Sequence, residues 1–214
     1  LEFRRVLFRS RLAEKMQQKY ILIKKPVLDS LCKKRYPLGR QSTRALCEAT
    51  FGTREVLDMA ILVSGGAGYI GSHTCIELLN AGYDVVVADN YYNASPVVLD
   101  RVKQITGKDF RFYQADMTKH EDVEKIFAEC PDITAVIQFA AYKAVGESVS
   151  KPIEYYYNNL NCTLVILDVM RRHNCHNFVF SSSATVYGDP ASVPITEDFP
   201  VGATTNPYGT TKAM

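Results

Sequence analysis

With 214 residues, of which 47% are hydrophobic and 22% are charged, the chain can bury a proper core and hold one large domain or two small ones. No apolar run reaches the roughly 18–20 residues of a membrane helix, so we expect no membrane partner. The net charge of +2 combines two unlike parts, because residues 1–58 carry 14 Lys and Arg against 6 Asp and Glu, whereas residues 59–214 carry 11 against 17.

Residues 1–58 show no sustained helical or strand periodicity. Basic clusters such as Lys33, Lys34 and Arg35 could bind nucleic acid. We prefer to interpret the segment as a disordered or non-native extension, because residues 7–10 (LFRS) look like a translated sequencing-adaptor end and Met59 then becomes the natural start. Basic residues interrupt its apolar stretches, which argues against a signal peptide. We therefore expect the domain to span residues 59–214 and to have no nucleic-acid partner.

From Met59 onward, short apolar runs alternate with helical patterns. The sequence predicts strands over residues 60–64, 84–89, 110–116, 133–141 and 177–183, and helices over residues 71–82, 119–130 and 152–173. In the second helix, Val123, Ile126 and Phe127 share one side. Near-continuous apolar strands separated by helices are typical of a parallel sheet covered on both faces. We therefore predict an α/β fold, a Rossmann-like doubly wound parallel sheet with its functional loops along one edge.

A glycine-rich segment, SGGAGYIG, joins the first predicted strand to the first predicted helix. Gly66, Gly68 and Gly71 form a G-x-G-x-x-G pattern, which is also G-x-x-G-x-x-G starting at Gly65. Without Cβ atoms the backbone can approach a pyrophosphate, and the helix N-terminus adds N–H donors and a favourable dipole. A simple structural turn is the alternative interpretation.

An acidic residue, Asp89, ends the second predicted strand 18 residues after Gly71. A carboxylate at this point accepts hydrogen bonds from the adenosine ribose hydroxyls and repels a 2′-phosphate. The following DNYYNAS segment offers no Arg or Lys to pair with such a phosphate. The sequence therefore predicts NAD rather than NADP as the cofactor.

The cysteines show no C-x-x-C pair and no framework spacing, which indicates reduced thiols and a cytoplasmic location. The HNCH run at residues 173–176 invites a zinc interpretation, but two histidines and a cysteine packed this closely before a strand make a poor tetrahedral set. We predict no metal site. The six cysteines are Cys32, Cys47, Cys75, Cys130, Cys162 and Cys175.

Two polar segments, FSSSATVYG and NPYGTTK, follow the fifth predicted strand. A serine at the end of that strand can bind a substrate hydroxyl and pass its proton to a tyrosine, or it can merely satisfy backbone groups. Tyr208 and Lys212 are four residues apart, so they lie on one face of a helix. Because the lysine charge favours the tyrosinate form, the pair is a candidate for proton exchange near neutral pH.

Five motifs occur in order and well spaced from Met59 onward: GGAGYIGSHT, FAAYKAVGES, KPIEYYYNN, FSSSATVYG and PYGTTK. Together they resemble the cofactor half of the epimerases that act on UDP-sugars in the extended short-chain dehydrogenase/reductase family. Dehydratases of that family place an acidic pair where this chain has Ser182, Ser183 and Ala184. The resemblance implies an NAD-dependent isomerase that oxidises the sugar transiently at C4, acts on a UDP-sugar and forms a homodimer.

The resemblance also implies roles for individual residues. Tyr208 would be the catalytic base and would also contact the cofactor, Lys212 would favour the ionised form of Tyr208 and hold the nicotinamide ribose, and Ser183 would bridge substrate and tyrosine. The remaining positions would hold NAD: Gly65, Gly68, Tyr69 and Ile70 with Gly71 of the motif at the pyrophosphate, Asp89 and Asn90 at the adenosine ribose, Asp116 and Met117 at the adenine, and Phe139, Ala140, Ala141, Lys143 and Asn158 beyond the fourth strand.

Three residues depart from the pattern of the resemblance. Ala141 and Tyr142 stand where Gly and Leu are expected, and Cys162 stands where Gly is common, which we interpret as tolerated variation. Because the resemblance stops just past Lys212, we expect the chain to be a fragment that lacks most of the UDP-sugar site and is not a competent enzyme alone. Another sugar-nucleotide epimerase or dehydratase and a non-catalytic NAD-binding module are the alternatives, with a nucleic-acid binder acting through residues 1–58 as the weakest.

Overall fold

The computed structural model describes residues 59–214, so the extension predicted over residues 1–58 lies outside the described residues. Within residues 59–214, β1 (Ala60–Ser64), β2 (Asp84–Asp89), β3 (Arg111–Gln114), β4 (Ile133–Gln138) and β5 (Asn177–Phe180) form one sheet in the order β3-β2-β1-β4-β5. Each neighbouring pair is parallel. The predicted doubly wound α/β fold is confirmed.

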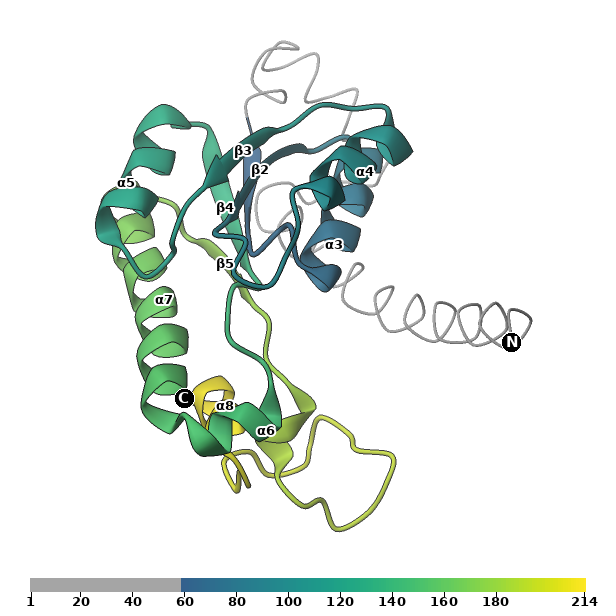
Figure 1. Cartoon of the computed structure of the whole chain (residues 1–214), viewed down its shortest axis with the longest axis vertical. Helices are drawn as coiled ribbons and strands as arrows, with labels where there is room; N and C mark the ends of the chain where they lie inside the picture. The colour runs from purple at the N-terminus through teal and green to yellow at the C-terminus, as the bar shows by residue number, and fades with distance from the viewer. Residues whose placement is uncertain (1–58) are drawn as a thin grey trace, which may run out of the picture. The chain divides into compact units, whose positions relative to one another are not determined.

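Helices cover both faces of this sheet (Figure 1). Helices α3 (Tyr69–Asn80) and α4 (Val97–Thr106) lie on one face, and α5 (His120–Glu129) and α7 (Pro152–Arg172) lie on the other. The short helices α6 (Val145–Ser150) and α8 (Pro207–Ala213) and the 3₁₀-helix η1 (Ala184–Tyr187) gather beyond the carboxyl ends of the strands. Among residues 59–214, none of the helices combines the length and the apolar character that a membrane crossing requires.

The core consists of two apolar layers, one on each side of the sheet. On β1, Leu62 packs toward α5 and α7 while Val63 packs toward α3 and α4, and every residue of the strand is buried. A central parallel strand is covered on both faces, which explains why its sequence is a continuous apolar run rather than an alternating one. Val123, Ile126 and Phe127 of α5 are buried together, as their predicted common side requires.

Three strands are shorter than the sequence predicts, so the expected ranges 110–116, 133–141 and 177–183 are wrong at their carboxyl ends. After β4, the N–H groups of Phe139 and Ala140 both donate to the Ser64 carbonyl, at 2.8 and 3.0 Å. Two donors on one acceptor end the regular ladder and turn the chain out of the sheet. The residues that leave the strands in this way border the cavity described below.

Two helices, α4 and α6, are absent from the sequence-based prediction. Helix α4 buries only Leu99 and Val102, and α6 has six residues of which only Ser148 is buried. Such short elements with few core positions show too little periodicity to be read from sequence. Helix α3 begins at Tyr69, two residues before its predicted start, because the glycine loop leads directly into its first turn.

Candidate functional site

A cavity of about 510 Å³ lies at the carboxyl ends of the strands. The chain leaves β1 toward α3 on one face and leaves β4 toward α6 and α7, so the cavity occupies the switch point where ligands bind in such sheets. Every residue that sequence analysis assigned to catalysis or to the cofactor lines it: Gly65, Gly68, Tyr69, Ile70, Gly71, Asp89, Asn90, Asp116, Met117, Phe139, Ala140, Ala141, Lys143, Asn158, Ser183, Tyr208 and Lys212.

The glycine loop forms one wall of the cavity and has no room for side chains at two positions. Gly65 has φ +75°, and a Cβ there would lie 2.5 Å from the Ala140 nitrogen. A Cβ on Gly71 would lie 2.2 Å from the Gly65 carbonyl oxygen. The first turn of α3, which follows, has no acidic residue and no side-chain cap. Its backbone N–H groups are therefore available to an anionic ligand beside a close-packed loop.

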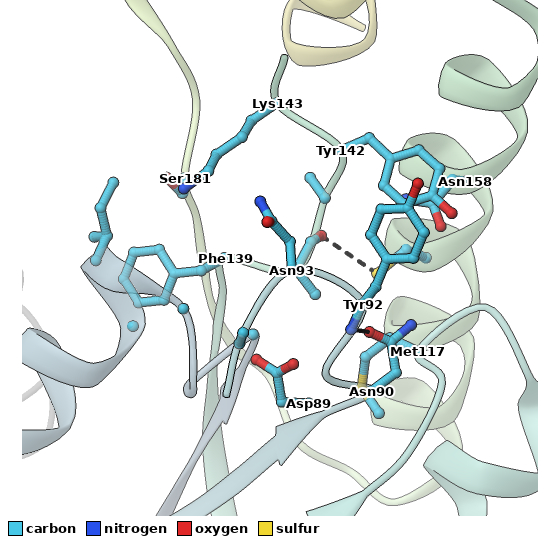
Figure 2. Close-up of a pocket in the computed structure, with 18 of the residues that line it drawn as sticks. Asp89, Asn90, Tyr92, Asn93, Met117, Phe139, Tyr142, Lys143, Asn158 and Ser181 are labelled. Carbon is cyan, nitrogen blue, oxygen red and sulfur yellow. Dashed lines mark hydrogen bonds between the residues drawn. The ribbon is translucent and has the colours of Figure 1, made fainter. Parts of the chain in front are cut away.

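Asp89 is buried at the end of β2 and ties two loops together. One carboxylate oxygen accepts a hydrogen bond from the Ala67 N–H at 3.0 Å, and the other accepts from the Tyr91 N–H at 2.9 Å. Each oxygen keeps a second acceptor position. Figure 2 shows the Asp89 carboxylate and the Asn93 side chain on the same side of the cavity. This corner can therefore accept hydrogen bonds from the hydroxyls of a ribose.

The neighbouring corner, near Asn90, is built by the loop after β3 (Figure 2). The Asp116 carboxylate accepts from the N–H of Thr118 at 3.0 Å and from its hydroxyl at 2.7 Å, and the Asp116 N–H donates to Asp122 at 2.8 Å. Met117 is buried beside them and lines the cavity. These local bonds fix the shape of the loop and place the apolar Met117 side chain next to polar groups, a combination that suits a nucleobase.

Lys212 sits on α8 with its ammonium group out of water. Its side chain is 7% exposed, Nζ donates to the Ser181 carbonyl at 2.9 Å, and Nζ lies 4.6 Å from the centre of the Phe180 ring. Burial lowers the pKa of Lys212 to about 8. Tyr208 lies one turn earlier on α8 and also lines the cavity. The Asn206 side chain caps this helix by accepting from the Gly209 N–H at 2.8 Å.

The three serines after β5 have different partners. Ser182 donates its hydroxyl to the Lys212 carbonyl at 3.2 Å, so the interpretation that these serines satisfy backbone groups fits Ser182. The Ser183 oxygen accepts from the Thr185 N–H at 3.3 Å and from the Thr185 hydroxyl at 3.0 Å. Because both bonds use Ser183 as an acceptor, its own proton can be donated into the cavity.

Asn159 is a buried residue of the site that sequence analysis missed. Its Oδ1 accepts from the Tyr142 N–H at 2.8 Å, and its Nδ2 donates to the Tyr142 carbonyl at 3.0 Å and to the Thr211 hydroxyl at 3.0 Å. It thereby joins α7 to the loop after β4 and to α8. The only sequence signal is its place beside Asn158. The other lining residues that were given no role from sequence lie within four positions of predicted ones: Tyr92, Asn93, Ala94, Ala115, Thr118, Tyr142, Cys162, Ser181 and Ser182.

Cys162, one of the departures from the family pattern, forms part of the cavity floor. Its side chain is 2% exposed, and Sγ lies 3.4 Å from the Gln138 Nε2 and 3.6 Å from the Ala140 carbonyl. Burial raises the pKa of Cys162 to about 12, so the thiol stays protonated at neutral pH. In the HNCH run, His173 contacts Glu124 at 2.6 Å, and residues 59–214 contain no group of three or more His, Cys, Asp or Glu that could hold a metal ion.

Comparison with known proteins gives consistent similarities. The model of the NAD dependent epimerase/dehydratase family matches residues 61–214. Over 156 residues, or 73% of this chain, it is 63% identical to UDP-glucose 4-epimerase of Haemophilus influenzae, and the match covers 46% of that protein. Over the same length it is 61% identical to UDP-glucose 4-epimerase of Bacillus subtilis, and the match covers 45% of that protein. It is similar to the crystal structure of UDP-glucose 4-epimerase from Bifidobacterium longum in complex with NAD+ and UDP, with a TM-score of 0.70, 60% identity, and coverage of 72% of this chain and 46% of that one. The chain thus spans about half the length of the curated relatives it matches.

Proposed function

The chain belongs to the NAD dependent epimerase/dehydratase family, and we propose that the protein carrying it interconverts UDP-glucose and UDP-galactose by transient NAD-dependent oxidation at sugar C4. The observation that carries this proposal is the meeting of Ser183, Tyr208 and Lys212 at one cavity with the glycine loop and Asp89. Identities above 60% to two named UDP-glucose 4-epimerases favour this sugar over the alternative family members. Because the chain spans about half of those relatives, the proposal concerns the whole protein.

The residues of the cavity fit NAD. The close-packed glycine loop leaves the pyrophosphate next to the first turn of α3, and Asp89 offers acceptors to a ribose while its charge opposes a 2′-phosphate. When bound, NAD supplies the acceptor for the hydride from the sugar. We propose that the predicted cofactor residues hold it along the cavity, with the adenine at Met117 and the nicotinamide end at Lys212.

In the proposed mechanism the protein moves one proton. Tyr208 accepts the proton of the sugar 4-hydroxyl and later returns it. Ser183 keeps its own proton and donates a hydrogen bond to the same sugar oxygen or to Tyr208. With a pKa of about 8, Lys212 is mostly protonated at neutral pH, so it places a positive charge at the same cavity as Tyr208. The bonds of Nζ to Ser181 and the Phe180 ring fix the position of that charge.

The test is a Tyr208→Phe change in a full-length protein that carries this sequence. We expect epimerisation of UDP-glucose, measured with a coupled assay, to fall by about 10²-fold or more, because a positioned acid or base contributes 10²- to 10⁴-fold. Binding of NAD, measured by calorimetry, should not change. Tyr157→Phe on α7, where the side chain is 72% exposed, is the matched control. Intact activity in Tyr208→Phe would instead support the non-catalytic module, and turnover of another UDP-sugar alone would support a different family member.

We further propose that the protein is a cytoplasmic homodimer. Helix α7 exposes Ile153, Leu164 and Leu167 at 78%, 64% and 40% on one side, an apolar stripe that a second copy of the helix would cover. Among residues 59–214, Cys75, Cys130, Cys162 and Cys175 are free and buried, which fits a reducing compartment. Sedimentation of the full-length protein measures the oligomeric state, and a monomer at micromolar concentration would contradict the dimer.

A further inference from the structure

Two tyrosines from different loops meet at the rim of the cavity. Tyr92 lies in the loop after β2, and Tyr142 lies in the loop after β4, with β1 between those two strands in the sheet. Their ring centres are 4.7 Å apart with the planes inclined by 35°, and both side chains line the cavity. Figure 2 shows the two rings against each other, next to Asn158 and above Asn90 and Met117. The contact therefore links the two loops beside the predicted adenosine end.

Tyr142 is the anchored member of this pair. Its backbone N–H and carbonyl both bond to Asn159, and its ring packs edge-on against Tyr155 at 5.5 Å. Tyr155 is itself fixed, because its hydroxyl donates to Glu147 at 2.9 Å and accepts from the Ala144 N–H at 3.1 Å. The loop after β4 is thus held to α6 and α7, and Tyr142 cannot move far without breaking several hydrogen bonds.

Tyr92 is the exposed member. Its side chain is 63% exposed, and its backbone N–H donates to the Asn90 side chain within the same loop. The residue before it, Tyr91, has φ +58° and packs against Phe112 rather than toward the cavity. The ring of Tyr142 is therefore the tertiary contact by which the Tyr92 ring is held over the cavity.

We propose that Tyr92 and Tyr142 form an aromatic latch that controls the rate at which a dinucleotide enters and leaves this cavity. The inference rests on the proposed function, because it needs NAD or NADH as the ligand. Met117, Lys212 and both tyrosines line the same cavity, so a ligand that extends from Met117 to Lys212 would lie beside the ring pair, and in the latch the two loops separate when it enters or leaves. Neither tyrosine was assigned a role from sequence, and Tyr142 stands where Leu was expected.

The latch makes a specific kinetic prediction. In the proposed latch the ring contact is the same before and after binding, so opening it costs the same on entry and on release, and a contact common to both states does not change the equilibrium. Stacked aromatic pairs of this kind stabilise their contact by a factor of about 2 to 10 beyond simple burial. Loss of one ring should therefore raise the association and dissociation rates together by about 2- to 10-fold and leave Kd unchanged within about twofold.

The experiment measures NADH binding to the 214-residue chain by stopped-flow fluorescence, with dissociation followed after mixing with excess NAD. The variants are Tyr92→Ala, Tyr142→Leu and the double variant, with Tyr92→Phe to keep the ring. We expect both single changes to accelerate both rates, the double change to add little, and Tyr92→Phe, which keeps the ring but loses the hydroxyl contact with Tyr142, to accelerate both rates less than Tyr92→Ala. Ile105→Ala on α4, where the side chain is 66% exposed, is the control for loss of an exposed apolar side chain away from the cavity.

Three outcomes overturn the latch. Unchanged rates in Tyr92→Ala would show that the ring pair does not limit passage. A faster dissociation with a proportionally weaker Kd and an unchanged association rate would make the tyrosines direct ligands rather than a latch. Absence of NADH binding by the unaltered chain would overturn the proposed cofactor site and the latch with it, so failure of the proposed function is distinguishable from failure of the latch alone.

Discussion

At the scale of single residues, Lys212 shows how the fold sets the chemistry of the cavity. Lys212 is 7% exposed and has lost most of its water, and the Ser181 carbonyl and the Phe180 ring lie close to its ammonium group. The charged form is therefore costly, and the pKa of Lys212 falls from 10.5 to about 8. The group is mostly charged at neutral pH but becomes neutral within the mildly alkaline range.

This pKa predicts a pH dependence of stability. Because the folded-state pKa of Lys212 lies below the unfolded-state value, the unfolded chain binds more protons between about pH 8 and 10.5, and the free energy of unfolding rises with pH. We expect the change in the free energy of unfolding between pH 7.5 and 9.5, measured in urea, to be more positive by about 2 kcal/mol in the unaltered chain than in Lys212→Met. The buried thiols Cys75 and Cys162, whose pKa is raised to about 12, lower the stability of both proteins with rising pH in the same range, so the difference between the two proteins reports Lys212. An equal slope in both proteins would show that Lys212 is not the group responsible.

At the scale of elements, Asn159 joins three segments that each carry part of the cavity. Its amide bonds to both backbone groups of Tyr142 and to the Thr211 hydroxyl, and Asn159 and Thr211 are themselves buried. The neighbouring Asn158 also lines the cavity, and its amide donates to Asn159. The two adjacent asparagines therefore have different roles: Asn159 holds elements together, whereas Asn158 faces the cavity.

We expect Asn159→Ala to lower the free energy of unfolding by roughly 2–3 kcal/mol, because it leaves buried donors and acceptors without partners. Asn158→Ala is the matched control, and we expect it to leave stability within about 0.5 kcal/mol while weakening NAD binding. Urea unfolding of the 214-residue chain measures the first effect and calorimetry the second. A small stability change in Asn159→Ala would mean that the loop after β4 is held by other contacts.

The starts of most strands were predictable from sequence, whereas the ends of β3, β4 and β5 were not. Predicted strand starts agree with β1, β2, β4 and β5 because a buried strand begins with its apolar run. The apolar run continues past the end of β4 into Phe139, Ala140 and Ala141, because these residues leave the sheet and line the cavity. Hydrophobicity records burial, and it does not record whether a residue's backbone pairs with a neighbouring strand. The boundary depends on bonds to Ser64, which is distant in sequence.

The difference between local and long-range contacts also explains which residues of the site could be predicted from the sequence. Glycines and Asp89 carry a local signal, because a tight turn and an acid after a strand have their chemistry in a few adjacent residues. The contacts of Asn159 and of the Tyr92–Tyr142 pair join residues 17 and 50 positions apart, and no local pattern encodes them. Only the folded arrangement of the loops brings these side chains together.

At the scale of the whole molecule, segments from the beginning, middle and end of residues 59–214 line the cavity. Residues from the loops after β1, β2, β3, β4 and β5 and from helices α7 and α8 line it. Because the strands are parallel, these segments all lie at the carboxyl ends of the strands, and the two apolar layers of the core hold the strands in place. All the residues that we propose to hold the cofactor therefore lie within residues 59–214.

We propose that residues 59–214 bind NAD without residues 1–58, and the comparison of the two chains tests this. The shortened chain has a net charge of −6, and the removed segment contributes +8, so long-range attraction of the anionic NAD is weaker without it. At 0.15 M salt the Debye length is about 8 Å, and most of that attraction is screened. We therefore expect calorimetric NAD affinities that agree within about twofold at this salt concentration and diverge only at low salt. A large loss of affinity or solubility in the shortened chain at 0.15 M salt would show that residues 1–58 belong to the native domain, because screening removes the electrostatic explanation.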